Sequence, residues 1–274
     1  MSKYILHNFD LLREEDFSLK INNRSFLYAD GFFESIKVIN SNCFNLEFHF
    51  ERIKKTVAFF KMDIDFSFSE LKNILDSLII KNKIIGGKIR IVFYRESVGK
   101  YFPEENTISF VAEIEKSNNG FLFNKNGLKL GVFKEIRKDK SKFSNYKTTN
   151  AAIYVLASIF AKESSLDDCL LLNIEDNIIE SSNSNLFLVK EDVIYTPPLE
   201  DGCVDGTMRS FMKSQFDVVE KSITKKDLFD ANEVFLTNAM QGVKLIEKFE
   251  EKKYQSHKFA RLVFDKLNDL HSKK

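Results

Sequence analysis

The 274-residue sequence lacks tryptophan altogether and contains only three prolines and ten glycines. Disordered and fibrous chains are rich in proline and glycine, so this composition excludes those classes. Phenylalanine, by contrast, occurs 28 times and supplies large apolar side chains for a packed core. The length suits one large domain or two domains of ordinary size.

An excess of charge of one sign is also lacking, since 41 Lys and Arg residues balance 40 Asp and Glu residues. Without a block of like charge, nucleic acid is not indicated as a partner. Cys43, Cys169 and Cys203 are odd in number and far apart, and they form no CxxC or Cys/His cluster. A disulfide framework and a metal site are therefore not expected, and free thiols indicate a reducing compartment.

Signals for export or membrane insertion are missing as well. Residues 1–16 lack the apolar core and the small-residue cleavage site of a signal peptide. The longest apolar runs are far too short to span a bilayer. A cytoplasmic, soluble protein is therefore expected, without a membrane as a partner.

The first part of the chain, residues 1–115, has the periodicity of a mixed α/β domain. Apolar and polar residues in strand-like order predict strands at 18–23, 32–40, 86–96 and 106–115. Apolar residues at helical spacing predict helices at 44–62 and 66–84. Ser67 or Ser69 is a candidate N-cap for the second of these helices.

Residues 116–127, which are rich in Asn, Gly and Lys, are typical of a linker between domains. The second part of the chain, residues 128–274, is expected to form a larger domain. Its predicted strands lie at 128–133, 169–176, 185–198 and within 232–254. Its predicted helices lie at 149–162, directly after the turn-rich patch 200–209, and at 256–270.

Lys147 stands between a tyrosine and a Thr-Thr-Asn turn, just ahead of an apolar helical run. A lysine at a helix start is usually solvated and is poorly placed for the helix dipole. Glu180, ahead of a polar run, and Arg52, on a predicted helix, are equally ordinary when taken singly. The turns at Thr207 and Asn238 could be plain loops, although backbone N–H groups in such turns can converge on an anion.

Taken together and in order, these features resemble the class IV aminotransferase family, the fold-type IV enzymes that use pyridoxal phosphate. The resemblance runs from about residue 20 to about residue 250, over the segments YADGFFESIKV, HFERI, YKTTN, ESSNSNLF, TPPLEDGCVDGTMR and FLTNAM. It implies an α/β (α+β) fold with a small N-terminal α/β domain and a larger C-terminal pseudo-barrel domain. It also implies a homodimer, in which residues 97–105 are the candidate interface loop.

The resemblance further implies how matching residues contact pyridoxal 5'-phosphate. Lys147 resembles the Schiff-base lysine and would also act as a general base, which requires burial and nearby cations to lower the pKa of its amine. Glu180 would contact the pyridine nitrogen and keep it protonated. The residues implied for the phosphate are Arg52, Thr207, Met208, Asn238 and Ala239.

One departure from the family pattern and two further matches accompany this assignment. The family more often has Ile-Thr where this chain has Thr207-Met208, so a hydroxyl contact at Met208 is lost while backbone contacts remain. Asn185 and Arg209 also match family positions and are expected to be structural.

Two stretches resemble aminodeoxychorismate lyase, which converts 4-amino-4-deoxychorismate to 4-aminobenzoate and pyruvate, a step toward folate. The segment FLTNAMQGV is similar to the Asn-Ala-Leu/Met turn of the lyases. Ser35 stands where the lyase has a threonine hydroxyl that is thought to act at the leaving pyruvyl group. Lys100 stands where the lyase has a carboxylate-binding arginine, although a lysine lacks the bidentate fork.

Other residues leave the substrate open. Arg95 is a candidate for a substrate carboxylate in either kind of enzyme, and Tyr28 and Phe33 are expected to line the pocket or to pack in the core. Glu34 favours an amino-acid aminotransferase of branched-chain or D-amino-acid type, but Ala152 stands where branched-chain enzymes have a tyrosine. The lyase is the preferred hypothesis. The alternatives are such an aminotransferase and a non-catalytic scaffold of the same fold, which the matching lysine and glutamate disfavour.

Overall fold

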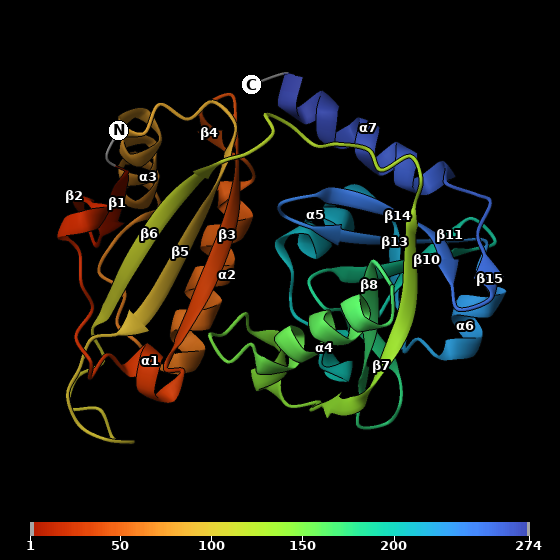
Figure 1. The fold of residues 1–274 in the computed structure, drawn as a ribbon, viewed down its shortest axis with the longest axis horizontal. Helices are drawn as coiled ribbons and strands as arrows, with labels where there is room; N and C mark the ends of the chain where they lie inside the picture. Colours follow the sequence, from red (N-terminus) through yellow and green to blue (C-terminus); the bar gives the residue numbers. More distant parts are fainter. Residues whose placement is uncertain (1–2, 273–274) are drawn as a thin grey trace. The chain divides into compact units, whose positions relative to one another are not determined.

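Residues 3–272 are described by the computed structural model, and they fall into two units (Figure 1). Unit 1 comprises the chain up to Gly120 together with Lys147–Asn150, and unit 2 comprises the rest. The boundary after Gly120 lies inside the segment 116–127, which has the composition of a linker. The assignment of Lys147–Asn150 to unit 1 has no counterpart in the periodicity of the sequence.

Unit 1 is built on a six-stranded antiparallel sheet with the order β2-β1-β6-β5-β3-β4. Its strands are β1 (Tyr4–His7), β2 (Asp10–Arg13), β3 (Gly31–Ile39), β4 (Asn42–Cys43), β5 (Gly87–Arg95) and β6 (Ile108–Lys116). Helices α2 (Leu46–Phe60) and α3 (Phe68–Lys81) pack on one face of this sheet (Figure 1). A 3₁₀ turn (Glu14–Asp16) and the short helix α1 (Arg24–Tyr28) precede β3.

Helices α2 and α3 form where the apolar spacing predicts them. Ser67 is the N-cap of α3, because its hydroxyl accepts a hydrogen bond from the backbone N–H of Glu70. The carboxylate of Glu70 in turn accepts from the backbone N–H of Ser67 at 2.8 Å, which completes a capping box. Of the two candidate serines, Ser67 is therefore the cap.

Strand alternation sorts the side chains of unit 1 onto two faces. Phe32 and Ile36 of β3 belong to the apolar core formed with α2 and α3. Successive residues of a strand point to opposite faces, so Phe33 and Ser35 point away from these helices. Arg90 of β5 is paired with Ser35 and shares its face.

The strand expected at 18–23 is wrong. This segment forms a turn, and Asn23 then caps helix α1 by accepting a hydrogen bond from the backbone N–H of Phe26. Leu19 and Ile21 are 51% and 81% exposed, so the alternation there has no buried face to support a strand.

Unit 2 contains a nine-stranded sheet in which β9 pairs with both β8 and β10. The order β10-β13-β14-β7-β8-β9 therefore returns to β10 and closes a ring, which is the barrel-like sheet that the resemblance implies. The strands are β7 (Leu128–Lys138), β8 (Asp168–Asn173), β9 (Ile178–Ser181), β10 (Asn185–Lys190), β11 (Val193–Thr196), β12 (Val218–Glu220), β13 (Glu233–Asn238), β14 (Gly242–Phe249) and β15 (Lys252–Lys253). The single stretch 185–198 is thus a hairpin of two strands.

Helices pack on the outside of this sheet. The helices are α4 (Ala152–Glu163), α5 (Thr207–Gln215), α6 (Lys225–Asp230) and α7 (Lys258–Ser272), with 3₁₀ turns at Lys142–Asn145 and Leu199–Asp201. Helix α4 contacts β7 and β8, α5 contacts β13, and α7 contacts β13 and β14.

Helix α4 begins at Ala152, three residues later than the sequence predicts, because the preceding residues pair with unit 1. The backbone N–H of Thr149 donates to the carbonyl of Gly31 at 3.0 Å, and Thr148 forms an isolated β-bridge with Phe32. These backbone contacts place Lys147–Asn150 in unit 1.

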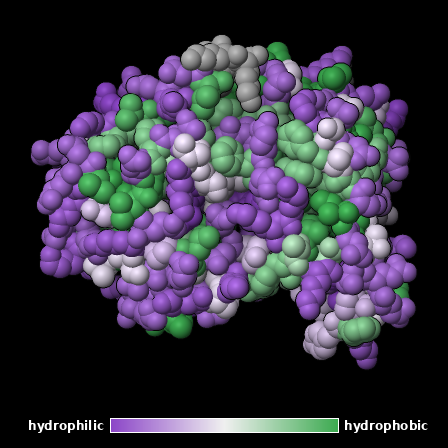
Figure 2. Space-filling model, turned by 180° about the vertical axis from the view of Figure 1, so that it is seen from behind, coloured by the Kyte–Doolittle hydropathy of each residue, from purple (hydrophilic) through white to green (hydrophobic). Residues whose placement is uncertain are grey.

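Within residues 3–272, no helix has the length and apolar character needed to cross a membrane. On the face drawn in Figure 2, hydrophilic residues predominate and hydrophobic residues form separate patches. Cys43, Cys169 and Cys203 are free thiols, as the sequence predicts.

Candidate functional site

Glu180 in β9 faces the side of the sheet that α4 covers, because it is paired with Leu171, which is buried against α4. The residue is 3% exposed. Its Oε1 accepts from Lys138 Nζ at 2.6 Å and from the Tyr154 hydroxyl at 2.9 Å, and its Oε2 accepts from the backbone N–H of Val204 at 2.9 Å. A carboxylate has about four acceptor positions, so the described residues leave one on Oε2, which fits a protonated ring nitrogen.

The N-terminus of α5 fits a phosphate. Gly206 is its N-cap and supplies no side chain to cap the helix. The N–H groups of the first turn, at Thr207 and Met208, therefore have the orientation and the helix dipole that bind anions. The side chain of Met208 is buried, so a phosphate contact by this residue would come from its backbone.

The turn after β13 is held by the side chain of Asn238. Its Oδ1 accepts from the backbone N–H groups of Met240 and Gln241 at 3.0 and 2.8 Å. Its Nδ2 donates to Ser184 Oγ at 2.9 Å. Because the Asn238 side chain is engaged within the turn, a phosphate contact here would come from the backbone of Asn238 and Ala239.

Asn185 joins these three elements. It is paired with Glu180 on one side and with Thr237 on the other. Its Nδ2 donates to the carbonyl of Val204 at 2.8 Å, and its Oδ1 lies so close to Gly206 that a Cβ there would collide with it. Unit 2 thus brings together Glu180, the start of α5 and the Asn238 turn through one structural asparagine.

Arg209 is also structural in this arrangement. It is 2% exposed and forms an ion pair with Glu220 and a hydrogen bond to the carbonyl of Pro197 at 3.2 Å. These contacts hold α5 against β12 and the segment after β11.

Lys147 lies beside β3 in unit 1. The backbone N–H of Phe33 donates to the carbonyl of Lys147 at 3.0 Å. The ammonium group of Lys147 lies 4.4 Å from the centroid of the Phe33 ring, within cation–π range. Ser35 follows two residues later on the same face of the strand, so the structure brings these three predicted residues to one face of unit 1.

Arg90 is a residue of this face that the sequence interpretation missed. Its guanidinium carbon lies 4.5 Å from the centroid of the Phe33 ring, and the residue is partly buried. Among the residues that the structure describes, none forms a hydrogen bond or ion pair with its side chain. The signal was present in the sequence: Arg90 alternates with Ile89 and Ile91, which are core residues, and so must point away from the core.

Arg52 lies on the opposite face, where it pairs with Glu34. Its Nε donates to Glu34 Oε1 at 2.7 Å and its Nη2 to Oε2 at 2.5 Å, while His49 Nδ1 lies 2.6 Å from Oε2. Burial alone would raise the pKa of Glu34, but Arg52 and His49 outweigh it and hold the pKa at about 2. A phosphate contact by Arg52 stays a prediction, and it would be made by a guanidinium whose charge is shared with Glu34.

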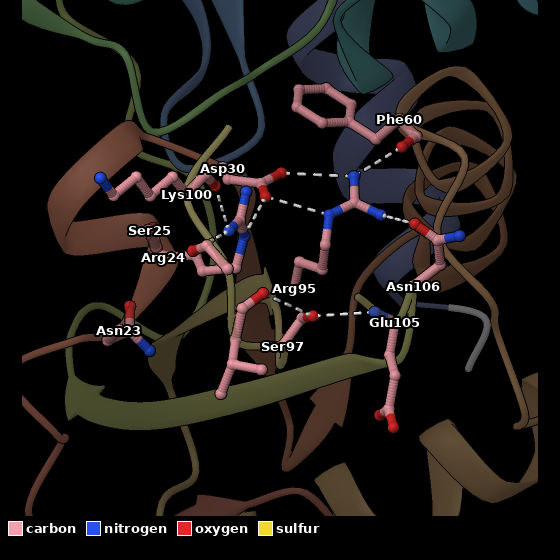
Figure 3. A network of polar contacts seen from close by, with 12 residues as sticks. Asn23, Arg24, Ser25, Asp30, Phe60, Arg95, Ser97, Lys100, Glu105 and Asn106 are labelled. Atoms are coloured by element: carbon pink, nitrogen blue, oxygen red, sulfur yellow. Dashed lines mark hydrogen bonds and ion pairs between the residues drawn. The ribbon is translucent and has the colours of Figure 1, made fainter. Parts of the chain in front are cut away.

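The geometry argues against the predicted role of Arg95 at a substrate carboxylate. Its Nε donates to Asp30 Oδ2 at 3.0 Å, and its other donors bond Asp30, Asn106 and the carbonyl of Phe60 at the end of α2 (Figure 3). One further donor bonds the carbonyl of Lys61. All five N–H donors of a guanidinium are thereby used. Arg95 is 7% exposed and acts as a C-terminal cap of α2.

Asp30 also binds Arg24, which anchors the loop at residues 97–105. Arg24 Nε donates to Asp30 at 2.7 Å, and its Nη1 donates to the carbonyls of Lys100 at 2.7 Å and Gly99 at 3.1 Å (Figure 3). The side chain of Lys100 is exposed. Tyr28 is 39% exposed, with its ring centroid 5.6 Å from that of Tyr101 in the same loop.

The chain is similar to known proteins in both sequence and fold. The model of the family described as amino-transferase class IV matches residues 31–249. An aminodeoxychorismate lyase of Vibrio harveyi is 27% identical, with 81% of this chain and 84% of that protein covered. A D-alanine aminotransferase of Bacillus licheniformis is 26% identical, with 87% and 86% covered.

The fold has a solved counterpart in the 4-amino-4-deoxychorismate lyase of Pseudomonas aeruginosa. The TM-score is 0.85 at 20% identity, and the alignment covers 97% of this chain and 98% of that chain. At this identity, the likeness concerns the fold alone.

Proposed function

Because the chain belongs to the class IV aminotransferase family and is a pyridoxal-phosphate-dependent enzyme, we propose that it is a 4-amino-4-deoxychorismate lyase. The reaction splits 4-amino-4-deoxychorismate into 4-aminobenzoate and pyruvate, so its product would serve folate synthesis. A C–H bond and a C–O bond break and the ring becomes aromatic, without any further reactant.

The residues of unit 2 fit the cofactor. Glu180 offers the remaining acceptor position on Oε2 to the ring nitrogen, and the backbone at Thr207, Met208 and Ala239 offers donors to the phosphate. When bound, the cofactor withdraws electrons from the substrate carbon that carries the amino group.

The chain's own groups would hold and move the protons. The amine of Lys147 would hold the cofactor and remove the proton from the amino-bearing carbon. The hydroxyl of Ser35 would donate a proton to the oxygen of the leaving enolpyruvyl group. Phe33 lies beneath the Lys147 ammonium and would orient it by the cation–π contact.

The observation that carries the proposal is the shared face of Lys147, Phe33, Ser35 and Arg90. The substrate has two carboxylates, and Arg90 offers a partly buried guanidinium that is paired across the strands with Ser35. A guanidinium binds a carboxylate through two parallel hydrogen bonds. Lys100, exposed on the loop, is a second candidate for a substrate carboxylate.

A second candidate function is an amino-acid aminotransferase. The similarity to the D-alanine aminotransferase of Bacillus licheniformis favours it, because it covers slightly more of this chain than the similarity to the lyase. Arg90 and Lys147 would serve a keto acid equally well, so only the reaction itself separates the two.

The experiment supplies the purified protein and pyridoxal 5'-phosphate with 4-amino-4-deoxychorismate. Equal amounts of 4-aminobenzoate and pyruvate are expected, and Ser35→Ala is expected to slow their release. Lys147→Ala should abolish both products, while Lys129→Met, at an exposed lysine of β7, should leave them unchanged. Amino exchange between D-alanine and a keto acid, with no 4-aminobenzoate formed, would overturn the proposal in favour of the aminotransferase.

We further propose that the protein is a cytoplasmic homodimer in which the loop at residues 97–105 contacts the second subunit. Tyr101 and Phe102 at its tip are 89% and 84% exposed, which is typical of contact residues awaiting a partner surface. Replacement of both by serine should shift the mass measured by light scattering from dimer to monomer. An unchanged dimer would remove this loop from the interface.

A further inference from the structure

Lys138, Tyr154 and Glu180 form a closed triangle of hydrogen bonds inside unit 2. Lys138 Nζ donates to the Tyr154 hydroxyl at 2.6 Å and to Glu180 Oε1 at 2.6 Å, and the hydroxyl of Tyr154 lies 2.9 Å from the same oxygen. The three side chains come from the end of β7, from α4 and from β9. Lys138 and Glu180 are 8% and 3% exposed, so water contributes little to this cluster.

The ammonium of Lys138 is fully used. Its third donor bonds the carbonyl of Ser144 at 2.9 Å, in the 3₁₀ turn shortly before Lys147 in the sequence. An ammonium has three donors and no acceptor, so all of its hydrogen-bonding capacity is satisfied by the protein. Lys138 is therefore held as a charged partner of Glu180 and is not a nucleophile that competes with Lys147.

The direction of each proton in the triangle follows from this. Since Lys138 can only donate, the oxygen of Tyr154 accepts from it, and the hydroxyl proton of Tyr154 points to Glu180. Burial raises the pKa of Tyr154 well above its usual value of 10, and the Glu180 carboxylate raises it further. Tyr154 therefore keeps its proton and remains a donor at neutral pH.

Both side-chain donors contact Oε1, and this leaves one acceptor position on Oε2 to a ligand. The backbone N–H of Val204 supplies the single protein contact to Oε2 that the described residues make. With both oxygens held, the carboxylate cannot rotate without breaking hydrogen bonds that are shielded from water. Its remaining acceptor position has a fixed direction.

We propose that Lys138 and Tyr154 are positioning residues that hold the carboxylate of Glu180 turned toward the ring nitrogen of pyridoxal 5'-phosphate. The inference rests on the proposed function, in which Glu180 contacts that nitrogen. Without the ammonium of Lys138, Oε1 loses a charge-assisted hydrogen bond and the carboxylate is held less firmly. The acceptor position on Oε2 would then no longer have a fixed direction toward the ring nitrogen.

The test measures cofactor binding in the full-length protein. Cofactor-free protein is titrated with pyridoxal 5'-phosphate to obtain the dissociation constant, and the absorption of the bound cofactor is recorded against pH. Lys138→Met should weaken binding by about ten- to a hundredfold, by analogy with the loss of a group that orients a metal-ligating side chain. It should also change the pH dependence of the absorption band.

Two further variants separate charge from packing. Lys138→Arg keeps the positive charge and should restore most of the affinity and the pH dependence. Tyr154→Phe removes one hydrogen bond and should weaken binding about two- to tenfold. The matched controls Lys129→Met on β7 and Tyr195→Phe on β11 should change neither measurement.

Wild-type affinity and an unchanged pH dependence in folded Lys138→Met and Tyr154→Phe would overturn the inference. If Lys138→Met fails to fold, Lys138→Arg and Tyr154→Phe decide it by the same two measurements. Glu180→Gln separates this inference from the proposed function. If Glu180→Gln loses affinity while the Lys138 and Tyr154 variants do not, only the positioning role is overturned. If Glu180→Gln behaves like the wild type, the role of Glu180 at the ring nitrogen is overturned as well.

Discussion

Each unit buries one carboxylate beside a basic side chain and a ring-bearing side chain, yet the two clusters are built differently. In unit 1, Arg52 binds Glu34 through two nitrogens, one on each oxygen, and a histidine adds a third contact. In unit 2, Lys138 and Tyr154 both contact the same oxygen of Glu180. A guanidinium fork places charged donors on both oxygens of a carboxylate, whereas in unit 2 the ammonium and the hydroxyl share Oε1 and Oε2 accepts from the backbone N–H of Val204.

Burial and a neighbouring cation therefore do not distinguish a ligand-binding carboxylate from a structural one. Glu34 and Glu180 are 1% and 3% exposed, and both have a cation within hydrogen-bonding distance. What differs is the placement of donors around each carboxylate. We interpret the Glu34 cluster as a structural pair and the Glu180 cluster as part of the cofactor site.

The largest effect is expected from breaking the pair in unit 1. Arg52→Met leaves Glu34 buried without its main cation, and removing one partner of a buried pair costs about 3–5 kcal/mol of unfolding free energy. Urea unfolding measures this loss. Lys54→Met on the same helix, which breaks an exposed pair with Glu51, should cost less than about 1 kcal/mol.

The same variant tests the predicted phosphate contact of Arg52. If the role of Arg52 is structural, folded Arg52→Met should bind pyridoxal 5'-phosphate with nearly wild-type affinity. A large loss of affinity in the folded variant would instead give Arg52 both roles and weaken the contrast between the clusters.

A somewhat smaller effect is expected from acid. Because the pKa of Glu34 is lowered from 4.5 to about 2 on folding, its contribution to stability is fully present above pH 4.5 and is lost as the pH falls toward 2. The contribution is on the order of 3 kcal/mol. Urea unfolding between pH 7 and pH 2.5 should show this loss in the wild type and a shallower one in Glu34→Gln. If the unfolding free energies of the wild type and of Glu34→Gln fell in parallel with pH, Glu34 would not be the group responsible for the loss.

The smallest effect concerns two arginines of unit 1. The donors of Arg95 are all hydrogen-bonded within the protein, whereas Arg90 is a candidate for binding a substrate carboxylate. Arg90→Ala should raise the KM for a carboxylate substrate about tenfold, the value of one charge-assisted contact, with little change in stability. Lys88→Ala, two residues earlier on the same face of β5, is the matched control and should leave the KM unchanged. An unaltered KM in Arg90→Ala would move the carboxylate site elsewhere, with Lys100 as the next candidate.

Much of the fold follows from local patterns in the sequence. Apolar spacing predicts α2, α3 and α7, because one face of each helix must be buried. The strand at 18–23 fails since alternation alone does not create a core for Leu19 and Ile21 to enter. The return of Lys147–Asn150 to unit 1 was not predictable either, because it depends on backbone pairing with β3, more than a hundred residues earlier.

The candidate site shows the same division. Lys147 and Glu180 could be proposed from the sequence because they lie in segments that match, in order, those of a family. Lys138 was missed because a lysine at the end of a strand looks solvated, and its partners lie 16 and 42 residues away. Alternation separates Arg95 from Arg90. Arg95 continues the apolar series Ile89, Ile91 and Phe93 and so lies on the core side, whereas Arg90 lies on the opposite face.

Asp30 pairs with both Arg24 and Arg95, and through Arg24 it fixes the start of the loop at residues 97–105. The tip of this loop remains exposed. The carbonyls of Gly99 and Lys100 are fixed by Arg24, while the aromatic side chains that follow have almost no packing of their own. Residues at the tip can therefore be substituted during evolution without disturbing the sheet that carries the loop. Such substitutions would change which molecules the loop contacts. We expect natural diversity among relatives to gather at 101–103 and the aspartate beneath to resist change.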